Sequence, residues 1–103
     1  MKQIIDGKRY NTETATEIGC DSFGYPGDGN HWEEALYHTK SGQFFLAGTG
    51  GGNTQYAHQV DSNSRSGGSR ITVLSPPEAF AWAESHLTTE EVEGAFEDVI
   101  EDA

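Results

Sequence analysis

The chain is 103 residues long, has 17 acidic side chains against six Lys and Arg, and carries a formal net charge of −11. This length suits one domain with a modest core, because a chain this short leaves about a third of its unfolded-state surface exposed after folding. The negative charge argues against a protein that binds nucleic acid or anionic membranes directly, and it favours partners with basic surfaces.

The N-terminal part of the chain predicts a hairpin followed by irregular structure. Residues 2–10 read as two short strands joined by an Asp-Gly pair, which favours a two-residue hairpin turn. Asn11 can cap a short helical turn that ends near Gly19. Residues 20–31 contain the turn-rich segment YPGDGN, and no periodic pattern supports a strand or a helix there.

The middle of the chain predicts the strands of an antiparallel sheet. Residues 35–39 and 43–47 read as the clearest hairpin, with Lys-Ser-Gly as the turn between them. Two glycine-rich stretches, 48–52 and 62–68, enclose a short segment with a few apolar residues. Residues 70–74 read as the last strand, because ITVL is flanked by polar residues.

Two helices are predicted at the C-terminus. Ser75 is a strong N-cap, because two prolines follow it and Glu78 stands three residues after the cap. The apolar residues of this first helix are Ala79, Phe80, Ala83 and Leu87, with Trp82 beside them. Thr88 or Thr89 begins a second helix, whose apolar stripe is Val92, Ala95, Phe96, Val99 and Ile100. We therefore expect an α+β fold, with a small antiparallel sheet of three to four strands and two C-terminal helices packed on it.

The negative charge gathers in the C-terminal quarter of the chain. Residues 76–103 contain nine acids and no Lys or Arg, whereas residues 1–75 contain eight acids and six bases. We treat residues 1–103 as a single domain with a sheet-rich part over 1–75 and an acidic helical hairpin over 76–103. The candidate partner-binding residues lie away from the apolar stripe of the second helix, and they are Glu90, Glu91, Glu93, Glu97, Asp98, Glu101 and Asp102.

This acidity opposes the stability of the helix that carries it. Like charges three or four residues apart on a helix cost roughly 0.2–0.5 kcal/mol per pair. Acids in the last turn oppose the helix dipole by about 0.3–1 kcal/mol each, and Glu97, Asp98, Glu101 and Asp102 are expected there. Two explanations stay open. In the first explanation, the acids keep a small protein soluble or suit a salty cytoplasm. In the second, they form a surface for a basic groove on a partner.

The spacing of the acids makes the second explanation specific. Carboxylates one helical turn apart are separated by about 5–6 Å, which is comparable with the spacing of phosphates along one nucleic-acid strand. A row of carboxylates could thus occupy a DNA-binding channel and release the same counterions, and its binding would weaken as salt rises. Aromatic residues could add contact area, although core packing suits most of them, and they are Tyr25, Trp32, Tyr37 and Tyr56.

Other chemistry-bearing features do not complete a motif. Residues 48–53 read GTGGGN, which lacks the Gly-Lys-Ser/Thr end of a Walker loop and the third glycine of a dinucleotide-binding loop. Cys20 has no paired cysteine, and the histidines show no ligand spacing at positions His31, His38, His58 and His86. We expect no catalytic residues, no metal and no cofactor, and a small hydrolase that uses Cys20 or a histidine is the least favoured alternative.

The cellular location follows from what the sequence lacks. No apolar run approaches the roughly 18 residues of a membrane span, and the N-terminus lacks a signal-peptide core. A single cysteine suits a reducing compartment. We expect a cytoplasmic monomer.

Three blocks of sequence resemble a known group of proteins. They are IIDGKRYNTETA (4–15), EALYHTKSGQFFLAGTGG (34–51) and GGSRITVLSPPEAFAWAE (67–84), and together they cover about half the chain. These blocks resemble a widespread family of small acidic proteins of bacterial mobile elements, which includes anti-CRISPR proteins that act on type I-C systems. The resemblance implies a compact α+β fold and an inhibitor that binds the crRNA-guided surveillance complex, at its DNA-recognising large subunit.

The residues and the resemblance together predict a non-enzymatic inhibitor. We expect an anti-CRISPR DNA mimic that binds the type I surveillance complex (Cascade) and blocks its binding of target DNA. The alternative is an acidic adaptor or neutralising partner of another basic protein, without DNA mimicry.

Overall fold

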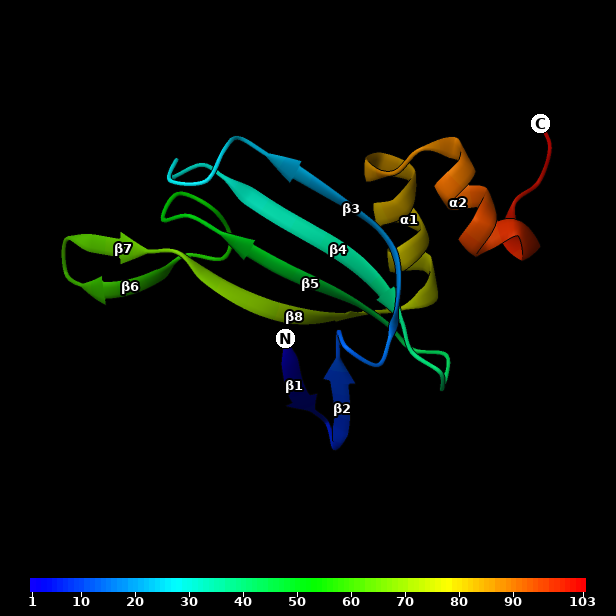
Figure 1. Cartoon of the computed structure of the whole chain (residues 1–103), viewed down its shortest axis with the longest axis horizontal. Coiled ribbons are helices and arrows are strands. Elements are labelled where there is room, and N and C mark those ends of the chain that lie inside the picture. The colour runs from blue at the N-terminus through cyan, green and yellow to red at the C-terminus, as the bar shows by residue number, and fades with distance from the viewer.

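A four-stranded antiparallel sheet forms the centre of the protein, as the computed structural model of residues 1–103 shows (Figure 1). Its strands lie in the order β3-β4-β5-β8, and two further sheets have two strands each. The strands are β1 (Lys2–Ile5), β2 (Lys8–Asn11), β3 (Thr16–Phe23), β4 (Trp32–His38), β5 (Phe44–Gly50), β6 (His58–Asp61), β7 (Ser64–Ser66) and β8 (Gly68–Leu74). The helices are α1 (Pro76–His86), α2 (Thr89–Phe96) and the short 3-10 helix η1 (Glu97–Val99).

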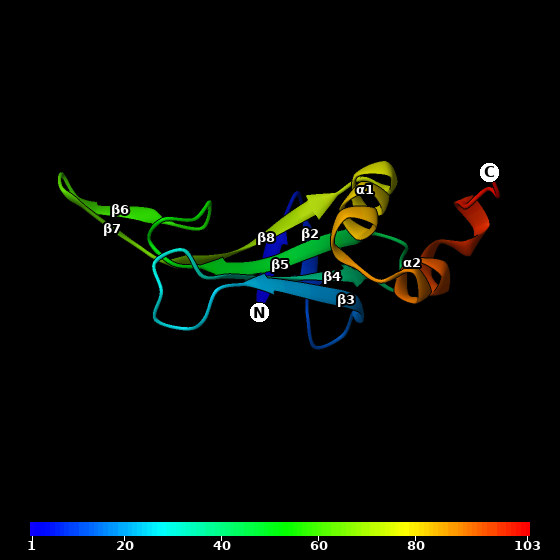
Figure 2. The same ribbon diagram turned by 90° about the horizontal axis from the view of Figure 1, so that it is seen from above.

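The protein is elongated, and the helices and the β6–β7 hairpin occupy opposite ends. Figures 1 and 2 both show α1 and α2 at one end of the long axis and β6–β7 at the other. The N-terminal hairpin β1–β2 runs across the direction of β8 (Figure 1). The α+β fold expected from the sequence is therefore confirmed, with the two C-terminal helices packed against a four-stranded sheet.

The register of β4 and β5 gives the central sheet two apolar faces. Leu36 pairs with Leu46, and the next pair along the strands is Tyr37 with Phe45. Because successive side chains of a strand point to opposite faces, the two leucines lie on one face and the two aromatic rings on the other. Both faces therefore need a cover.

The helices cover the leucine face of the sheet. Their buried contacts come from Ala79 and Ala83 of α1 and Phe96 of α2. The Phe96 ring lies 5.5 Å from the Phe44 ring and 5.2 Å from the Phe80 ring, measured between centroids. Phe96 thus ties α2 to both the sheet and α1.

The β1–β2 hairpin covers the aromatic face of the sheet. Tyr10 of β2 is buried against Phe45 and Ile71. The hairpin turn has positive φ angles at Asp6 (51°) and Gly7 (78°), which is the geometry that an Asp-Gly pair favours. The predicted N-terminal hairpin is thus confirmed.

Both helices begin where the sequence predicts. Ser75 and Thr88 each accept a hydrogen bond from the backbone N–H three residues later, and the Glu at that position bonds back to the cap backbone. Such a reciprocal capping box satisfies backbone donors that the first turn leaves unpaired. The sequence predicts both helix starts, but it identifies the reciprocal Glu only for the first helix.

The helical turn expected from Asn11 to Gly19 and the loop expected over 20–31 are both shorter than predicted, because the turn covers only 12–15 and the loop only 24–31. Asn11 does hold a tight turn, because its Oδ1 accepts from the Glu13 N–H at 3.0 Å, but β3 begins at Thr16 and runs to Phe23. Pairing with β4 outweighs the weak local preference for a helix. Gly19 is buried in this strand because Leu87 packs where its Cβ would lie.

The second helix is shorter than its apolar stripe predicts. It ends at Phe96, and Ala95 and Val99 are exposed instead of packed. Gly94 costs about 1 kcal/mol relative to Ala within a helix, and the acids that follow Phe96 would oppose the helix dipole if the helix continued. These local costs act together with the burial of Phe96, and the helix ends early.

Truncation of Phe96 tests this helix boundary. We expect Phe96→Ala to lower the free energy of unfolding by about 3–5 kcal/mol, because it leaves a cavity beside the Phe44 and Phe80 rings. Val99→Ala is the matched control, and it should change stability by no more than about 0.5 kcal/mol because Val99 is exposed. Urea titration measures both, and similar losses from both variants would contradict an end of α2 at Phe96.

Candidate functional site

The seven acids singled out from the sequence are all exposed, and no cation pairs with them. Histidine nitrogens lie close to carboxylates at two places, His31–Glu33 at 3.6 Å and His86–Asp21 at 2.9 Å, and no Lys or Arg pairs with a carboxylate anywhere in the protein. The acids of the C-terminal quarter are therefore not neutralised within the chain. With Glu84, the seven residues form what we call the acidic surface.

The six Lys and Arg residues lie on other elements. Three are on the β1–β2 hairpin, one is in the β4–β5 turn, and two are on β7 and β8; they are Lys2, Lys8, Arg9, Lys40, Arg65 and Arg70. None of them forms an ion pair with a carboxylate. The charge asymmetry of the sequence is thus kept in the folded protein.

Tertiary packing arranges part of the acidic surface around a groove between the two helices. Apolar side chains line the groove, and they are Phe80, Leu87, Val92 and Ile100. Acids from both helices and from the chain end line it too, and they are Glu84, Glu93, Glu97 and Asp102. Glu84 was not selected from the sequence. Its position four residues after Phe80 could have identified it, because residues at this spacing share a helix face.

The expected continuous helical row of carboxylates is not present. Because α2 ends at Phe96, only Glu90, Glu91 and Glu93 lie on it, while Glu97 and Asp98 belong to η1. The last two acids follow η1, outside any helix. The helical spacing of about 5–6 Å therefore applies only to Glu90 and Glu93.

Glu91 also has a role in the fold. Its carboxylate accepts hydrogen bonds from the backbone N–H and the hydroxyl of Thr88, both at 3.1 Å. This is the return half of the capping box at the start of α2. The other six candidate acids form no side-chain hydrogen bond within the protein, so their carboxylates are free to meet a partner.

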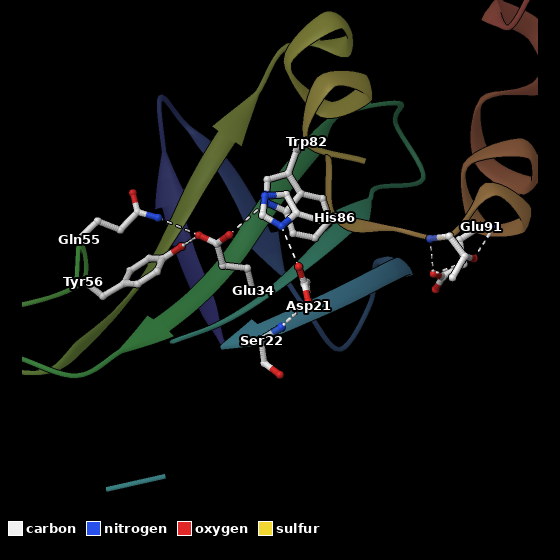
Figure 3. A network of polar contacts seen from close by, with 9 residues as sticks. Asp21, Ser22, Glu34, Gln55, Tyr56, Trp82, His86 and Glu91 are labelled. Carbon is white, nitrogen blue, oxygen red and sulfur yellow. Dashed lines mark hydrogen bonds and ion pairs between the residues drawn. The ribbon is translucent and has the colours of Figure 1, made fainter. Parts of the chain in front are cut away.

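A second polar constellation surrounds Glu34 of β4 (Figure 3). Glu34 is 6 % exposed, and its carboxylate accepts from the Trp82 Nε1–H at 3.0 Å, from the Gln55 amide at 2.8 Å and from the Tyr56 hydroxyl. Burial, together with this carboxylate, raises the pKa of the Tyr56 phenol, so the phenol stays protonated as a donor. Sequence reasoning missed this site, because its residues lie up to 48 positions apart.

Asp21 and His86 form a neighbouring pair (Figure 3). His86 Nδ1 donates to Asp21 Oδ2 at 2.9 Å, and the imidazole stacks on the Trp82 ring with centroids 4.6 Å apart. The hydrogen bond from His86 holds the pKa of the Asp21 carboxyl below its ordinary value. This pair joins the end of α1 to the edge strand β3.

The glycine-rich segment after residue 47 serves packing. Gly48, Thr49 and Gly50 belong to β5, so this glycine-rich stretch begins as strand. A Cβ on Gly48 would lie 1.9 Å from the Tyr56 hydroxyl oxygen, so only glycine lets Tyr56 reach Glu34. The close approach of the Tyr56 ring explains why residue 48 is a glycine. A phosphate-binding loop is not needed to explain it.

The aromatic and cysteine candidates from the sequence differ in their exposure. Tyr56 is buried, Trp32 and Tyr37 are half-buried, and Tyr25 is exposed, so core packing accounts for some of the aromatic residues and not for Tyr25. Cys20 is exposed and unpaired. No three His, Cys, Asp or Glu side chains are grouped closely enough to hold a metal ion. None of the helices has the length and apolar character needed to span a membrane.

Substitution of Gly48 tests the packing around Glu34. We expect Gly48→Ala to lower stability by about 1–3 kcal/mol, because the methyl group must displace the Tyr56 ring. The loss should shrink in a Tyr56→Ala background, where the clash is gone. Gly94→Ala is the matched control, with open space at its Cβ, and it should stabilise by roughly 0.5–1 kcal/mol. Thermal or urea unfolding distinguishes the expected loss of stability from the expected gain. An unchanged stability of the Gly48→Ala variant would contradict the packing.

The Asp21–His86 pair predicts a specific pH dependence of stability. Because the folded pKa of Asp21 lies below the ordinary 3.8, its contribution is present above about pH 4 and disappears as pH falls through the folded pKa. Asp21→Asn should therefore reduce the slope of melting temperature against pH in this acid range. His86→Ala should reduce the slope as well, and the double variant should add little. Additive effects of the two substitutions would contradict a direct pair.

Comparison with known proteins gives no relative. No protein-family model, curated protein or solved structure matches this chain.

Proposed function

We propose that this protein is a non-enzymatic inhibitor that binds a basic nucleic-acid-binding protein through its acidic surface and thereby excludes DNA. The observation that carries the proposal is the absence of cationic partners for the exposed acids of α1, α2 and the chain end. The like-charged carboxylates of such a surface repel one another, and this repulsion lowers the stability of the isolated protein. Contact with a basic groove would remove the repulsion.

DNA mimicry does not require the straight helical row expected from the sequence. The acidic surface extends over α1, α2, η1 and the residues that follow, and counterion release depends on how many charges meet the partner. We expect affinity to fall steeply with salt, because each neutralised charge contributes to the slope. The irregular arrangement favours mimicry of overall charge over mimicry of an exact phosphate path.

The proposed target is the crRNA-guided type I surveillance complex, Cascade, at the large subunit that recognises DNA. Support for this choice comes from the three sequence blocks that resemble the family with type I-C anti-CRISPR members. Two of these blocks form the hairpin β4–β5 and the strand and helix β8–α1, which build the scaffold that carries the acidic surface.

One observation favours the alternative of an acidic adaptor. The groove between the helices has an apolar lining beneath its acids, and DNA-binding channels have no need of an apolar partner surface. Such a groove would accept a segment with both apolar and basic side chains. An adaptor would bind through this lining, and its affinity would respond less to salt.

A charge-neutral variant tests the proposed function. We expect Glu90, Glu93, Glu97 and Glu101 changed together to Gln to abolish inhibition of target-DNA binding by the surveillance complex. The reason is the loss of four of the charges that would meet the partner. Gel-shift titration of the complex on labelled target DNA, at low and high salt, measures this effect.

The matched control removes four charges from other surfaces. It changes four exposed acids outside the C-terminal quarter to their amides, and these are Glu13, Glu17, Glu33 and Asp61. This control should inhibit like the unmodified protein, and circular dichroism should show both variants folded. Equal loss in both variants would contradict a localised acidic surface, whereas inhibition that persists at high salt would favour the adaptor.

A further inference from the structure

A cleft beside Glu34 is separate from the acidic surface. It lies where the loop before β4, the segment after β5 and the end of α1 meet. Its lining includes the Phe23 and Trp32 rings, the His86 imidazole and the Glu34 carboxylate. Asn30, Asn53 and Gln55 also line it. Aromatic, amide and carboxylate groups therefore surround one recess.

Glu34 is a buried carboxylate without a cation. All three of its hydrogen-bond donors, on Gln55, Tyr56 and Trp82, are neutral. The guanidinium of Arg70 lies 5.1 Å from the centroid of the Tyr56 ring and donates to the Gln55 carbonyl at 3.4 Å, so it does not bind Glu34. Buried carboxylates in proteins are usually paired with a cation.

The hydrogen bonds of Glu34 leave one acceptor position open. A carboxylate offers about four lone-pair sites, and the three donors occupy three of them. Oε2 accepts from both Gln55 and Tyr56, whereas Oε1 accepts only from Trp82. The open position is therefore on Oε1, and the three neutral donors already hold the carboxylate in place.

The aromatic wall of the cleft is also available. Phe23 is 57 % exposed, and its ring stacks on Trp32 with centroids 6.4 Å apart and an angle of 14° between the planes. The Trp32 ring in turn meets His86 edge-on at 5.9 Å. Indole faces attract cations, and most strongly those that are planar and weakly hydrated.

We propose that this cleft binds the guanidinium group of an arginine on the basic partner. The guanidinium would donate to Glu34 Oε1 and to the amide oxygens around the cleft, and its plane would lie against the aromatic wall. A planar group with five donors matches these acceptors, whereas the ammonium of lysine offers three donors and is more strongly hydrated. An anion is excluded by Glu34 and by the net charge of −11.

Arginine binding is tested on the isolated protein, without any partner. The probes are N-acetyl-arginine amide, the lysine equivalent, and the citrulline equivalent, in which a neutral urea replaces the guanidinium. We expect the arginine probe to shift the Trp32 indole N–H resonance in a saturable titration. The lysine and citrulline probes should bind at least about tenfold more weakly. The proposal would be overturned if the lysine or the citrulline probe bound as tightly as the arginine probe. It would also be overturned if the arginine probe gave no saturable shift.

Two variants locate the probe in the cleft. Glu34→Gln should weaken arginine binding about tenfold, because the charge-assisted hydrogen bond is lost. Glu33→Gln is the matched control: it removes one charge from the adjacent residue on the opposite face of β4, and binding should stay unchanged. Equal effects of the two would show attraction by overall charge and contradict the site.

A third variant covers the case in which Glu34→Gln does not fold. Trp32→Leu removes the aromatic wall and should also weaken binding about tenfold, with the Trp82 indole N–H as the reporter. The identity of the arginine-bearing partner rests on the proposed function, but the cleft does not. The four-Gln variant of the acidic surface should still bind the arginine probe, so failure of one proposal is distinguishable from failure of the other.

Discussion

The packing of α1 and α2 on the leucine face of the sheet is the interaction on which the acidic surface depends. Nine acids follow residue 75 with no Lys or Arg among them, so the elements that carry them repel one another. Burial of Phe96 among the rings of Phe44 and Phe80 offsets this repulsion. The same contact also determines where α2 ends, because the chain turns into η1 directly after the buried ring.

The capping boxes divide the acids into two kinds. Glu78 and Glu91 accept hydrogen bonds at the starts of the helices, where a negative charge is favourable. The acids after Phe96 have no such role and lie past the end of the helix, where a negative charge is least favourable. Their positions are therefore hard to explain by stability within the chain, which is the reason to look for a basic partner.

The Glu34 constellation shows a different way of placing a negative charge. Here the carboxylate is buried and held by three neutral donors, two from the segment after β5 and one from α1. Gly48 makes room for Tyr56, so a glycine in β5 belongs to the same arrangement. The cleft beside it joins this carboxylate to the half-buried Trp32 ring and the exposed Phe23 ring. Together, the cleft and the acidic surface give the protein two places that favour cations.

The sequence by itself determined the features that depend on near neighbours. The Asp6-Gly7 hairpin, the β4–β5 hairpin, β8 and both helix starts follow from turn chemistry and capping within a few residues. The candidate acids, which the sequence places off the apolar stripe of the second helix, are all exposed.

Only the tertiary structure decided the features that depend on distant partners. β3 became a strand because β4 lies beside it, and α2 stopped at Phe96 because burial of that ring and uncompensated acids outweigh the apolar stripe. The groove, with Glu84 in it, and the Glu34 cleft join residues that are far apart in the chain. Local propensity carries no information about such contacts, since their energy arises only when the sheet and helices have come together.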